Sequence, residues 1–448
     1  MKSRRDYSLS NWTDIGEGVE LDKPDKIVKL GFPESYRKGH AWIFGTTRCG
    51  KTRLMEWIIE QDIRRGYSVI CIDPKGDIPL FSKIVQVATD TGRLDDLLFF
   101  NPIFPNNSAT LDPLSSYYMV EELVAHITAG VAIGKDPYFF GVAYQVSLLV
   151  VQGLIMLAES KNEKPNFNLN DVKNNISHED IKSLRDKLLY LTDPEAKQLV
   201  ADLNKVINNP IEFYSKIANS LLVALTELTS GNVGKIIGRA KENRFISRLE
   251  NGKGVILVVQ LGSLLTKKAA YTAGKVIISM LQSYIGRVLA VGNKMDPPIS
   301  LHIDEAQNVL YQGIDDLFAK AGGANVYIHG YSQSVNQLYA EIGKERGNSI
   351  LDNCNTKIFM RVPDAETANY VSKHLGNKKT YSPILSVGGN LSIRETEDIR
   401  IDPSDVLNLD PRQMFFTTYS GTYRGITSDV ADPSITVVFP KVSRKLRG

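Results

Sequence analysis

Short apolar runs alternate with amphipathic stretches over much of the chain. Runs typical of fully buried strands occur at 40–44, 67–72, 254–260, 299–303, 325–331 and 357–362. Apolar residues at helical spacing occupy 53–63, 269–289 and 364–375. Strands that alternate with helices in this way predict βαβ units and a parallel sheet covered on both faces, which is an α/β fold.

The pattern changes between residues 116 and 250, where strand signals fade. Helices are expected there at Met119–Val131, Gly141–Ala158, Glu179–Leu191, Pro194–Asn208 and Glu212–Leu228. Strand-like patterning resumes at residue 254, as if a sheet had been interrupted. We therefore predict an all-α domain at 116–250, inserted into a discontinuous α/β domain formed by 1–115 and 251–448.

The two ends of the chain carry weaker signals. Lys26–Leu30 predicts one strand within a lead-in segment that is otherwise rich in turn residues. Near the other end, Gln413–Tyr419 and Ile435–Phe439 predict two more strands. The basic residues at 441–447 are interpreted as a solvated tail rather than a nucleic-acid arm.

One apolar stretch has the length of a membrane span. Residues 137–158 carry no charged side chain, and such a segment could cross a bilayer as a helix. However, Gln145, Gln152 and Glu159 recur every seventh residue and form a narrow polar stripe along one side of that helix. The stripe favours a bundle helix with one edge in water.

Composition narrows the class of protein without naming a partner. The chain has 448 residues, with 43% hydrophobic and 23% charged residues, as in an ordinary globular protein. A net charge of +3 is too small to indicate nucleic-acid binding by itself. Cys49, Cys71 and Cys354 are far apart and form neither a disulfide framework nor a zinc pattern, which favours a reducing compartment. The polar N-terminus shows no signal peptide.

The clearest chemical signal is a phosphate-binding loop (P-loop). The pattern G-x-x-x-x-G-K-[ST] is matched at every fixed position by Gly45, Thr46, Thr47, Arg48, Cys49, Gly50, Lys51 and Thr52. A strand-like run precedes the loop and a helical run follows it, as a P-loop requires. In such a loop the backbone N–H groups point at phosphates, Lys51 reaches the outer phosphates and the Thr52 hydroxyl ligates Mg²⁺. We expect ATP and Mg²⁺ to bind here.

A pair of carboxylates supplies the second part of the expected site. The run 299–303 ends in Asp304 and Glu305. At the carboxyl end of a strand, Asp304 could hold Mg²⁺ and Glu305 could polarise the attacking water. For His302, on the same strand, a hydrogen-bonded core position is expected because no second His or Cys lies at metal-ligand spacing.

Two further strand ends carry polar residues with two interpretations each. Asp73 and Lys75 follow the run 67–72 and could approach the phosphates, or Asp73 could bond its own turn. Gln333 follows the run 325–331 and could contact the γ-phosphate, or it could cap the next helix.

Together these segments resemble the conjugative coupling proteins of the TraD/TraG type, within the FtsK and HerA group of P-loop ATPases. The resemblance covers most of the chain from Lys26 to about Thr427. It rests on segments at 45–54, 61–66, 73–77, 303–307, 319–324, 332–334 and 364–368.

The resemblance implies a RecA-like nucleotide-binding domain with a mostly parallel sheet and an inserted all-α domain. It also implies an ATPase, assembled as a hexameric ring, that transfers single-stranded DNA. We expect single-stranded or double-stranded DNA as a partner, and we expect DNA to stimulate ATP hydrolysis. The DNA, with its bound relaxase, would pass to a type IV secretion channel at the inner membrane face. The roles carried over are phosphate binding for Lys51, magnesium binding for Thr52 and Asp304, water activation for Glu305 and γ-phosphate contact for Gln333.

Two departures from the family pattern stand out. Many members carry transmembrane helices before the P-loop, and no convincing span is present here. Three explanations stay open: the protein is a soluble variant, a partner supplies the membrane contact, or an N-terminal anchor is missing from this sequence. The segment 320–323, where several members place an arginine finger, contains no Arg. By position alone, Arg361 is the candidate, and the alternative for it is a surface ion pair.

Two other functions stay open. One is an ATP-switched receptor or scaffold for relaxosome or effector proteins. The other is a chromosomal DNA translocase of the same ATPase group.

Overall fold

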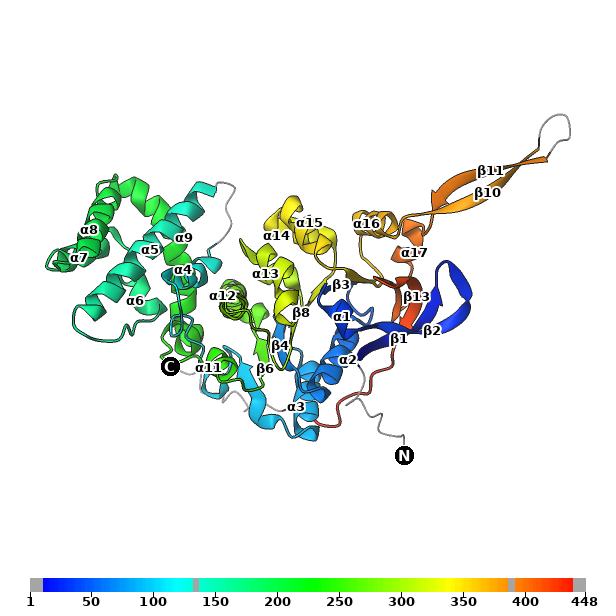
Figure 1. The fold of residues 1–448 in the computed structure, drawn as a ribbon, viewed down its shortest axis with the longest axis horizontal. Helices are drawn as coiled ribbons and strands as arrows, with labels where there is room; N and C mark the ends of the chain where they lie inside the picture. Colours follow the sequence, from blue (N-terminus) through cyan, green and yellow to red (C-terminus); the bar gives the residue numbers. More distant parts are fainter. Residues whose placement is uncertain (1–10, 132–136, 386–390, 438–448) are drawn as a thin grey trace. The chain divides into compact units, whose positions relative to one another are not determined.

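The structure is a computed structural model that describes residues 11–131, 137–385 and 391–437. Contacts divide the chain into two compact units. The helix-rich unit contains Ile59–Arg287 and the described part of Val430–Gly448, and the P-loop unit contains Leu9–Ile58 and Val288–Asp429. The chain passes from one unit to the other within helices α2 (Lys51–Arg64) and α12 (Ser263–Ala290) and after Asp429 (Figure 1).

The P-loop unit is built on a sheet in the strand order β2-β1-β13-β12-β9-β3-β8-β7. Its strands are β1 (Trp12–Glu20), β2 (Lys23–Pro33), β3 (Ala41–Phe44), β7 (Ile299–Ile303), β8 (Val326–Ser332), β9 (Thr356–Phe359), β12 (Gln413–Thr418) and β13 (Gly421–Thr427). The strands β9, β3, β8 and β7 are parallel, and every residue in them is buried. Their carboxyl ends therefore meet at one edge of the sheet, where ligands bind in open α/β folds.

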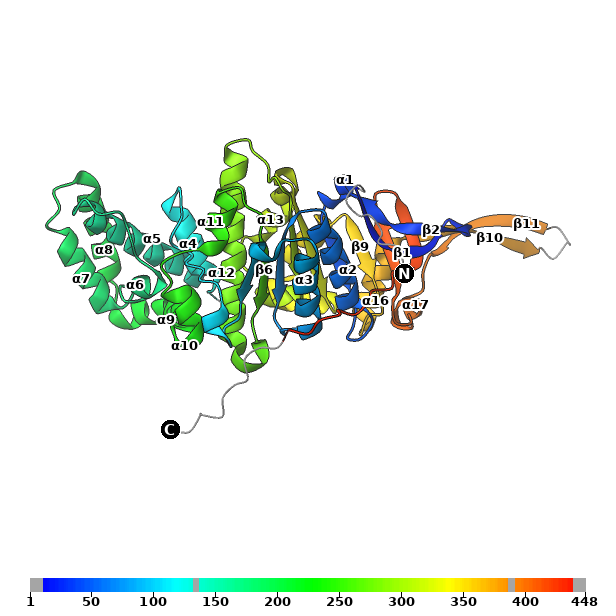
Figure 2. The same ribbon diagram turned by 90° about the horizontal axis from the view of Figure 1, so that it is seen from below.

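The P-loop unit also contains short helices and a β-hairpin that is not part of the large sheet. Besides the parts of α2 and α12 that this unit contains, the helices are α1 (Glu34–Arg37), α13 (Ile314–Lys320), α14 (Val335–Ile342), α15 (Lys344–Asp352), α16 (Ala365–Leu375) and α17 (Pro403–Leu407). Strands β10 (Asn377–Leu385) and β11 (Leu391–Ile399) form a separate two-stranded antiparallel sheet. Figures 1 and 2 show that this hairpin extends away from the other elements of its unit.

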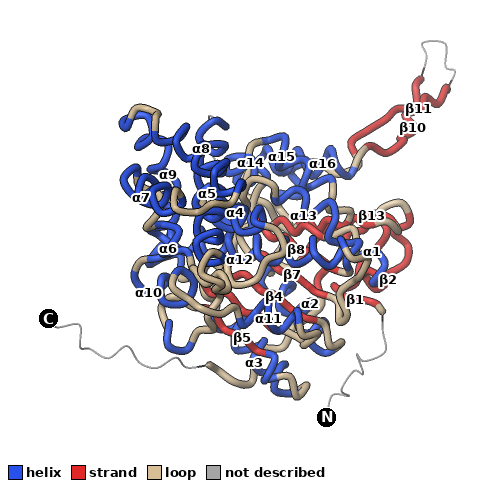
Figure 3. The backbone as a smooth tube through the Cα atoms, turned by 60° about the vertical axis from the view of Figure 1, so that its left-hand side comes forward, coloured by secondary structure: helices blue, strands red, loops and turns tan. Residues whose placement is uncertain are grey.

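The helix-rich unit has three parallel strands in the order β4-β6-β5. These are β4 (Ser68–Asp73), β5 (Leu97–Phe100) and β6 (Ile256–Gln260). Its helices, besides the parts of α2 and α12 that it contains, are α3 (Ile78–Asp90), α4 (Val120–Ala129), α5 (Pro137–Glu159), α6 (Leu169–Lys173), α7 (His178–Leu188), α8 (Pro194–Ile207), α9 (Ile211–Thr229), α10 (Gly231–Val233) and α11 (Arg244–Glu250). The described residues from α4 to α11 form helices and loops (Figure 3). That 116–250 make a separate inserted domain stays a prediction.

Helix α5 contains the apolar stretch singled out in the sequence. By length and composition it is the one helix in the described residues that could cross a membrane, and 39% of its apolar window is buried. It contacts α4, α7, α8 and α9. Gln145 and Glu159 of the polar stripe are exposed and Gln152 is half-buried, as expected for a bundle helix with one edge in water.

The predicted elements fail mainly at the ends of the chain. The lead-in holds two long strands, β1 and β2, where one short strand was expected. Both strands are largely polar and lack a continuous apolar run that would mark their full length. The strand expected at Ile435–Phe439 is wrong over 435–437, and its remaining residues lie outside the described part, as does the basic end at 441–447. The segment instead bonds to side chains of α3, because Val437 N–H donates to Ser82 Oγ at 3.0 Å.

Candidate nucleotide-binding site

The start of the phosphate loop is hydrogen-bonded to residues at or just after the ends of β8 and β9, the two strands that flank β3. Phe44, the last residue of β3, pairs in register with Ser332 of β8 and with Phe359 of β9. Directly after Phe44, the Gly45 N–H donates to the Ser332 carbonyl at 3.1 Å, and the Thr46 N–H donates to the Arg361 carbonyl at 2.7 Å. The start of the loop is thereby fixed to both flanking strands, and α2 begins at Lys51.

A third segment, which sequence reasoning missed, holds the other side of the loop. The Arg412 N–H donates to the Cys49 carbonyl at 2.8 Å. Arg412 has a φ of 72°, in the left-handed region that is costly for this residue type. A Cβ placed on Gly50, which has a φ of 107°, would lie 3.4 Å from Arg412 Cγ. No local sequence signal marks Arg412, because its contact with the loop joins segments far apart in the chain.

The loop has the donors that a phosphate chain requires. Among the described residues, the N–H groups of Arg48, Cys49 and Gly50 have no backbone acceptor. Arg48 and Gly50 both have positive φ, which curls the backbone in front of the α2 N-terminus. The Lys51 side chain is 8% exposed, and its Nζ lies 3.2 Å from the Gly45 carbonyl. Amide donors, a helix N-terminus and an ammonium group suit polyphosphate.

Cys49 fills space within this loop. It is 2% exposed, and its Sγ lies 3.0 Å from the Thr46 carbonyl and 3.6 Å from Met360 Sδ. Burial raises the pKa of the Cys49 thiol, although the Lys51 amide and ammonium oppose the shift. The thiol is therefore neutral near pH 7, which supports the interpretation of Cys49 as a small apolar filler.

The candidate carboxylates follow β7 without a break. Ile303 pairs with Gly330 of β8, and Asp304, which is 6% exposed, comes next. Glu305 adopts a left-handed conformation with φ 44° and ψ 47°. Its carboxylate accepts from Asn308 Nδ2 at 3.3 Å, and its carbonyl accepts from the Asn308 N–H at 2.9 Å. A strained backbone with a tethered carboxylate is typical of a pre-oriented functional group.

Strand order explains how these distant segments meet. β3 is the direct neighbour of β8, and β8 is the direct neighbour of β7. Neighbouring strands lie about 4.8 Å apart, so the ends of β3 and β7 are separated by about 10 Å. Lys51 and Thr52 follow the first strand and Asp304 follows the second, at the same edge. A hydrated magnesium ion with its phosphates would fit between them, so the donor set suits MgATP.

The structure decides one of the two interpretations of Gln333. The cap of α14 is Ser334, whose Oγ accepts from the Gln337 N–H at 3.3 Å. The capping role proposed for Gln333 is therefore wrong. The half-buried Gln333 side chain follows β8 at the same edge as the phosphate loop, and its contact with a γ-phosphate stays a prediction.

Arg361 supports the loop through its backbone rather than through an ion pair. Its carbonyl accepts from Thr46, and its side chain is exposed. Within the described residues no ion pair involves the Arg361 guanidinium, so the surface ion pair is not found there. Its role as an arginine finger stays a prediction.

Asp73 follows the turn interpretation. In the helix-rich unit, its carboxylate accepts from the N–H groups of Lys75 and Gly76 at 3.0 Å each and from that of Asp77 at 2.5 Å. Asp77 in turn caps α3 by accepting from the Leu80 N–H at 2.9 Å. Asp73 is thus committed to shaping its own loop.

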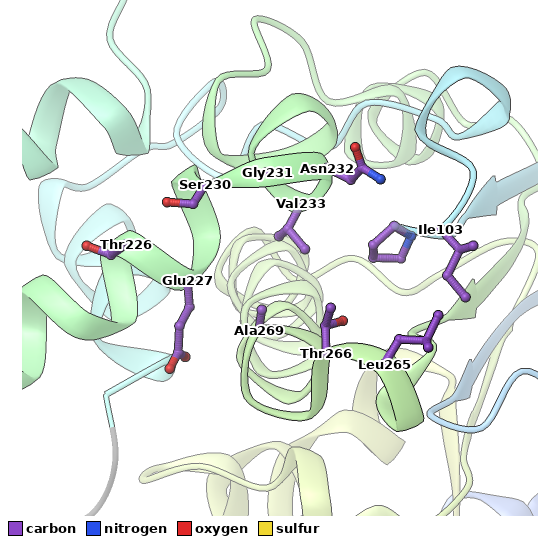
Figure 4. A pocket seen from close by; sticks show the side chains of 11 residues that line it. Ile103, Thr226, Glu227, Ser230, Gly231, Asn232, Val233, Leu265, Thr266 and Ala269 are labelled. Carbon is purple, nitrogen blue, oxygen red and sulfur yellow. The ribbon is translucent and has the colours of Figure 1, made fainter. Parts of the chain in front are cut away.

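A pocket of about 620 Å³ lies within the helix-rich unit (Figure 4). Apolar side chains such as Ile103, Val233 and Leu265 line it, and no Lys, Arg or His is among the lining residues. Its one carboxylate, Glu227, accepts from the Thr272 hydroxyl at 2.8 Å. Because it lacks cationic donors, this pocket does not suit a phosphate chain.

Comparison with known proteins agrees with the resemblance in the motifs. Residues 298–399 match a family described as the TraM recognition site of TraD and TraG. The chain is 22% identical over 432 residues to the type 4 coupling protein DotL of Legionella pneumophila. This alignment covers 82% of the chain and 53% of DotL, so the chain spans about half the length of this curated relative.

Solved structures share the fold at low sequence identity. The unbound conjugative coupling protein TrwB is 16% identical, with a TM-score of 0.65 over 91% of this chain and 89% of TrwB. TrwB in complex with ADP and Mg²⁺ has a TM-score of 0.64 at 16% identity, over 90% and 88% of the two chains. VirB4 of Thermoanaerobacter pseudethanolicus is 12% identical, with a TM-score of 0.54 over 93% and 97%. The chain therefore has the RecA-like P-loop fold and is similar to the TraD/TraG-type conjugative coupling proteins.

Proposed function

We propose that this chain is the ATP-hydrolysing part of a type IV coupling protein. The observation that carries the proposal is the convergence of the phosphate loop, Asp304, Glu305 and Gln333 at one edge of the parallel strands. Lys51 would bind the outer phosphates of ATP, and Thr52 and Asp304 would hold Mg²⁺. Mg²⁺ would neutralise charge that develops on the phosphates during transfer.

Glu305 would orient and deprotonate the attacking water. Its tether to Asn308 fixes one carboxylate oxygen. Gln333 would sense the γ-phosphate, and α14, which begins two residues later, would carry the resulting movement. Because the nucleotide sites of ring ATPases are completed by neighbouring subunits, Arg361 is proposed as the finger acting in a hexamer.

The substrate of the motor is proposed to be DNA carried with its bound relaxase toward a secretion channel at the inner membrane face. TrwB binds ADP, Mg²⁺ and ATP analogues according to its structures, and DotL is a type 4 coupling protein. These relatives support nucleotide use and the coupling role. Type IV secretion components and the relaxosome are the proposed partners.

The deciding experiment measures ATP turnover with and without single-stranded DNA in wild type, Lys51→Ala and Glu305→Gln. A motor predicts turnover that DNA stimulates and that both substitutions abolish, while Glu305→Gln still binds nucleotide. Turnover that ignores DNA but responds to a relaxosome protein would support the receptor instead. Absence of turnover in wild type under all these conditions would refute the ATPase.

A further inference from the structure

A chain of buried polar side chains links β7 to β8 just before the candidate catalytic residues. Arg37 NH2 donates to Ser300 Oγ at 3.1 Å, and Ser300 Oγ lies 2.9 Å from His302 Nε2. On the other side of the ring, His302 Nδ1 lies 3.0 Å from the Tyr331 hydroxyl oxygen. Ser300, His302 and Tyr331 are each 0% exposed. No bulk water competes for these bonds, which makes them strong and sensitive to geometry.

The His302 ring is held on its edges and on its face. A neutral imidazole has one donor and one acceptor nitrogen, so its two bonds can be satisfied together. The ring also stacks on His329 with centroids 4.5 Å apart and planes at 6°. His302 and His329 are direct partners in the β7–β8 register. The ring therefore has little freedom to move relative to β8.

The position of this link along the strands suggests its purpose. His302 stands two residues before Asp304, and Tyr331 stands two residues before Gln333. Alternate residues of a strand share a face, and His302 and Tyr331 are each the last residue on their face before the strand ends. The contact between His302 and Tyr331 therefore joins β7 and β8 close to their carboxyl ends.

We propose that His302 is a positioning residue for ATP hydrolysis and acts through Tyr331. Together they fix the separation between the β7 end, which carries Asp304 and Glu305, and the β8 end, which carries Gln333. A misplacement of 1 Å in an active site can reduce the rate by about 100-fold. This inference rests on the proposed ATPase function, because His302 and Tyr331 would act only by positioning the residues proposed for hydrolysis. Neither side chain is proposed to touch the nucleotide.

Two matched substitutions on one strand test the proposal. Tyr331→Phe removes the hydroxyl that meets His302, whereas Tyr327→Phe removes a hydroxyl that donates to Glu34 Oε1 at 2.8 Å, near the other end of β8. Both tyrosines are 0% exposed. We expect Tyr331→Phe to lower kcat for MgATP by about 10-fold to 100-fold with a Kd within about twofold of wild type. Tyr327→Phe should keep kcat within about twofold. His302→Leu should resemble Tyr331→Phe, and His302→Gln, which can still bond Tyr331, should recover part of kcat.

Hydrogen exchange provides a readout that does not depend on turnover. With a nonhydrolysable ATP analogue and Mg²⁺, the wild type should gain protection at both 303–309 and 332–338. Tyr331→Phe should lose that gain at 332–338, and Tyr327→Phe should retain it. A wild type that binds the analogue without hydrolysing ATP would refute the ATPase and still leave this comparison decisive. Equal kcat and equal protection in the two tyrosine variants would overturn the positioning role.

Discussion

The N–H of Arg412 donates to the carbonyl of Cys49 at 2.8 Å and so closes the phosphate loop from a segment that follows α17. The bond is made with Arg412 in a left-handed conformation, φ 72°. For residues other than Gly and Asn, that conformation costs free energy. It therefore persists only when surrounding contacts fix it. The C-terminal part of the P-loop unit thereby contributes to the candidate nucleotide site.

This contact predicts a difference between two backbone substitutions. Arg412→Pro removes the donating N–H and requires a φ near −65°, so it should weaken MgATP binding by about tenfold or more. Arg412→Gly keeps the N–H and accepts positive φ, so it should weaken binding less. Titration with a fluorescent ATP analogue measures both affinities. Equal affinities for the two variants would show that the loop keeps its shape without this bond.

The placement of Lys51 and Asp304 at one edge of the sheet could be predicted from the sequence because each lies in a local pattern. An apolar run fixes the strand, the residue that follows is placed at the strand end, and parallel strands bring such ends to one edge. The same reasoning identified the strands later described as β3, β7 and β8. Buried parallel strands give the strongest pattern because all their side chains are apolar or paired.

Arg412, Ser332 and Tyr331 could not be assigned in this way. Their roles depend on contacts between segments far apart in the chain, and no composition or periodicity marks them. The strands β1 and β13 were missed for a different reason. One face of each is solvated, so their residues mix with those of turns. The alternation in such strands is too weak to separate them from loops.

The proposed magnesium ligands predict a change in metal dependence. Thr52→Ala and Asp304→Asn each remove one oxygen ligand or its charge, so each should raise the Mg²⁺ concentration for half-maximal ATP turnover by about tenfold. Asp316→Asn is the control, because Asp316 is an exposed carboxylate on α13 that pairs with Lys320. It should leave the magnesium titration unchanged. A titration that all three variants leave unaltered would remove Thr52 and Asp304 from the metal site.

Buried histidines predict loss of stability in mild acid. Burial, with a smaller contribution from Arg287, lowers the pKa of His126 from 6.5 to about 3, and His126 Nδ1 lies 2.9 Å from Ser279 Oγ. Because the unfolded chain binds the proton at higher pH than the folded chain, this stability is present above pH 6.5 and is lost as the pH falls toward 3. His40 and His374, each with a pKa lowered to about 4 by burial, act in the same direction.

Replacement of His126 tests this pH dependence. Urea denaturation at about pH 7.5 and about pH 5.5 measures how much unfolding free energy each protein loses on acidification. This loss should be about 1.4 kcal/mol smaller in His126→Asn than in wild type. Ser279→Ala removes the partner and keeps the titrating ring, so it should lower stability at both pH values and leave the difference near that of wild type. An unchanged difference in His126→Asn would contradict the assigned cause.

Replacement of Arg287 should cause a large loss of stability in the helix-rich unit. The Arg287 side chain is 9% exposed. Arg287 Nε lies 3.4 Å from Glu122 Oε2, and Arg287 NH1 lies 3.2 Å from Glu250 Oε1. Removing one partner of a buried ion pair leaves an unpaired charge, which costs about 3 kcal/mol, so Arg287→Met should lower the unfolding free energy by that order. Lys320→Met is the matched control, because Lys320 pairs with Asp316 on the surface, where the two side chains are 66% and 60% exposed. This substitution should lower the unfolding free energy by less than about 1 kcal/mol.

A second substitution separates the charge from the packing of Arg287. If the unpaired Glu122 carboxylate causes the loss, Arg287→Met combined with Glu122→Gln should regain part of the stability that Arg287→Met alone removes. Arg287 also lies over the ring of Tyr118, with its guanidinium carbon 5.1 Å from the ring centroid. Loss of that contact would persist in the double variant. Urea denaturation of the four proteins of this cycle gives the coupling energy, and additive losses would show that Arg287 acts through packing rather than through its charge.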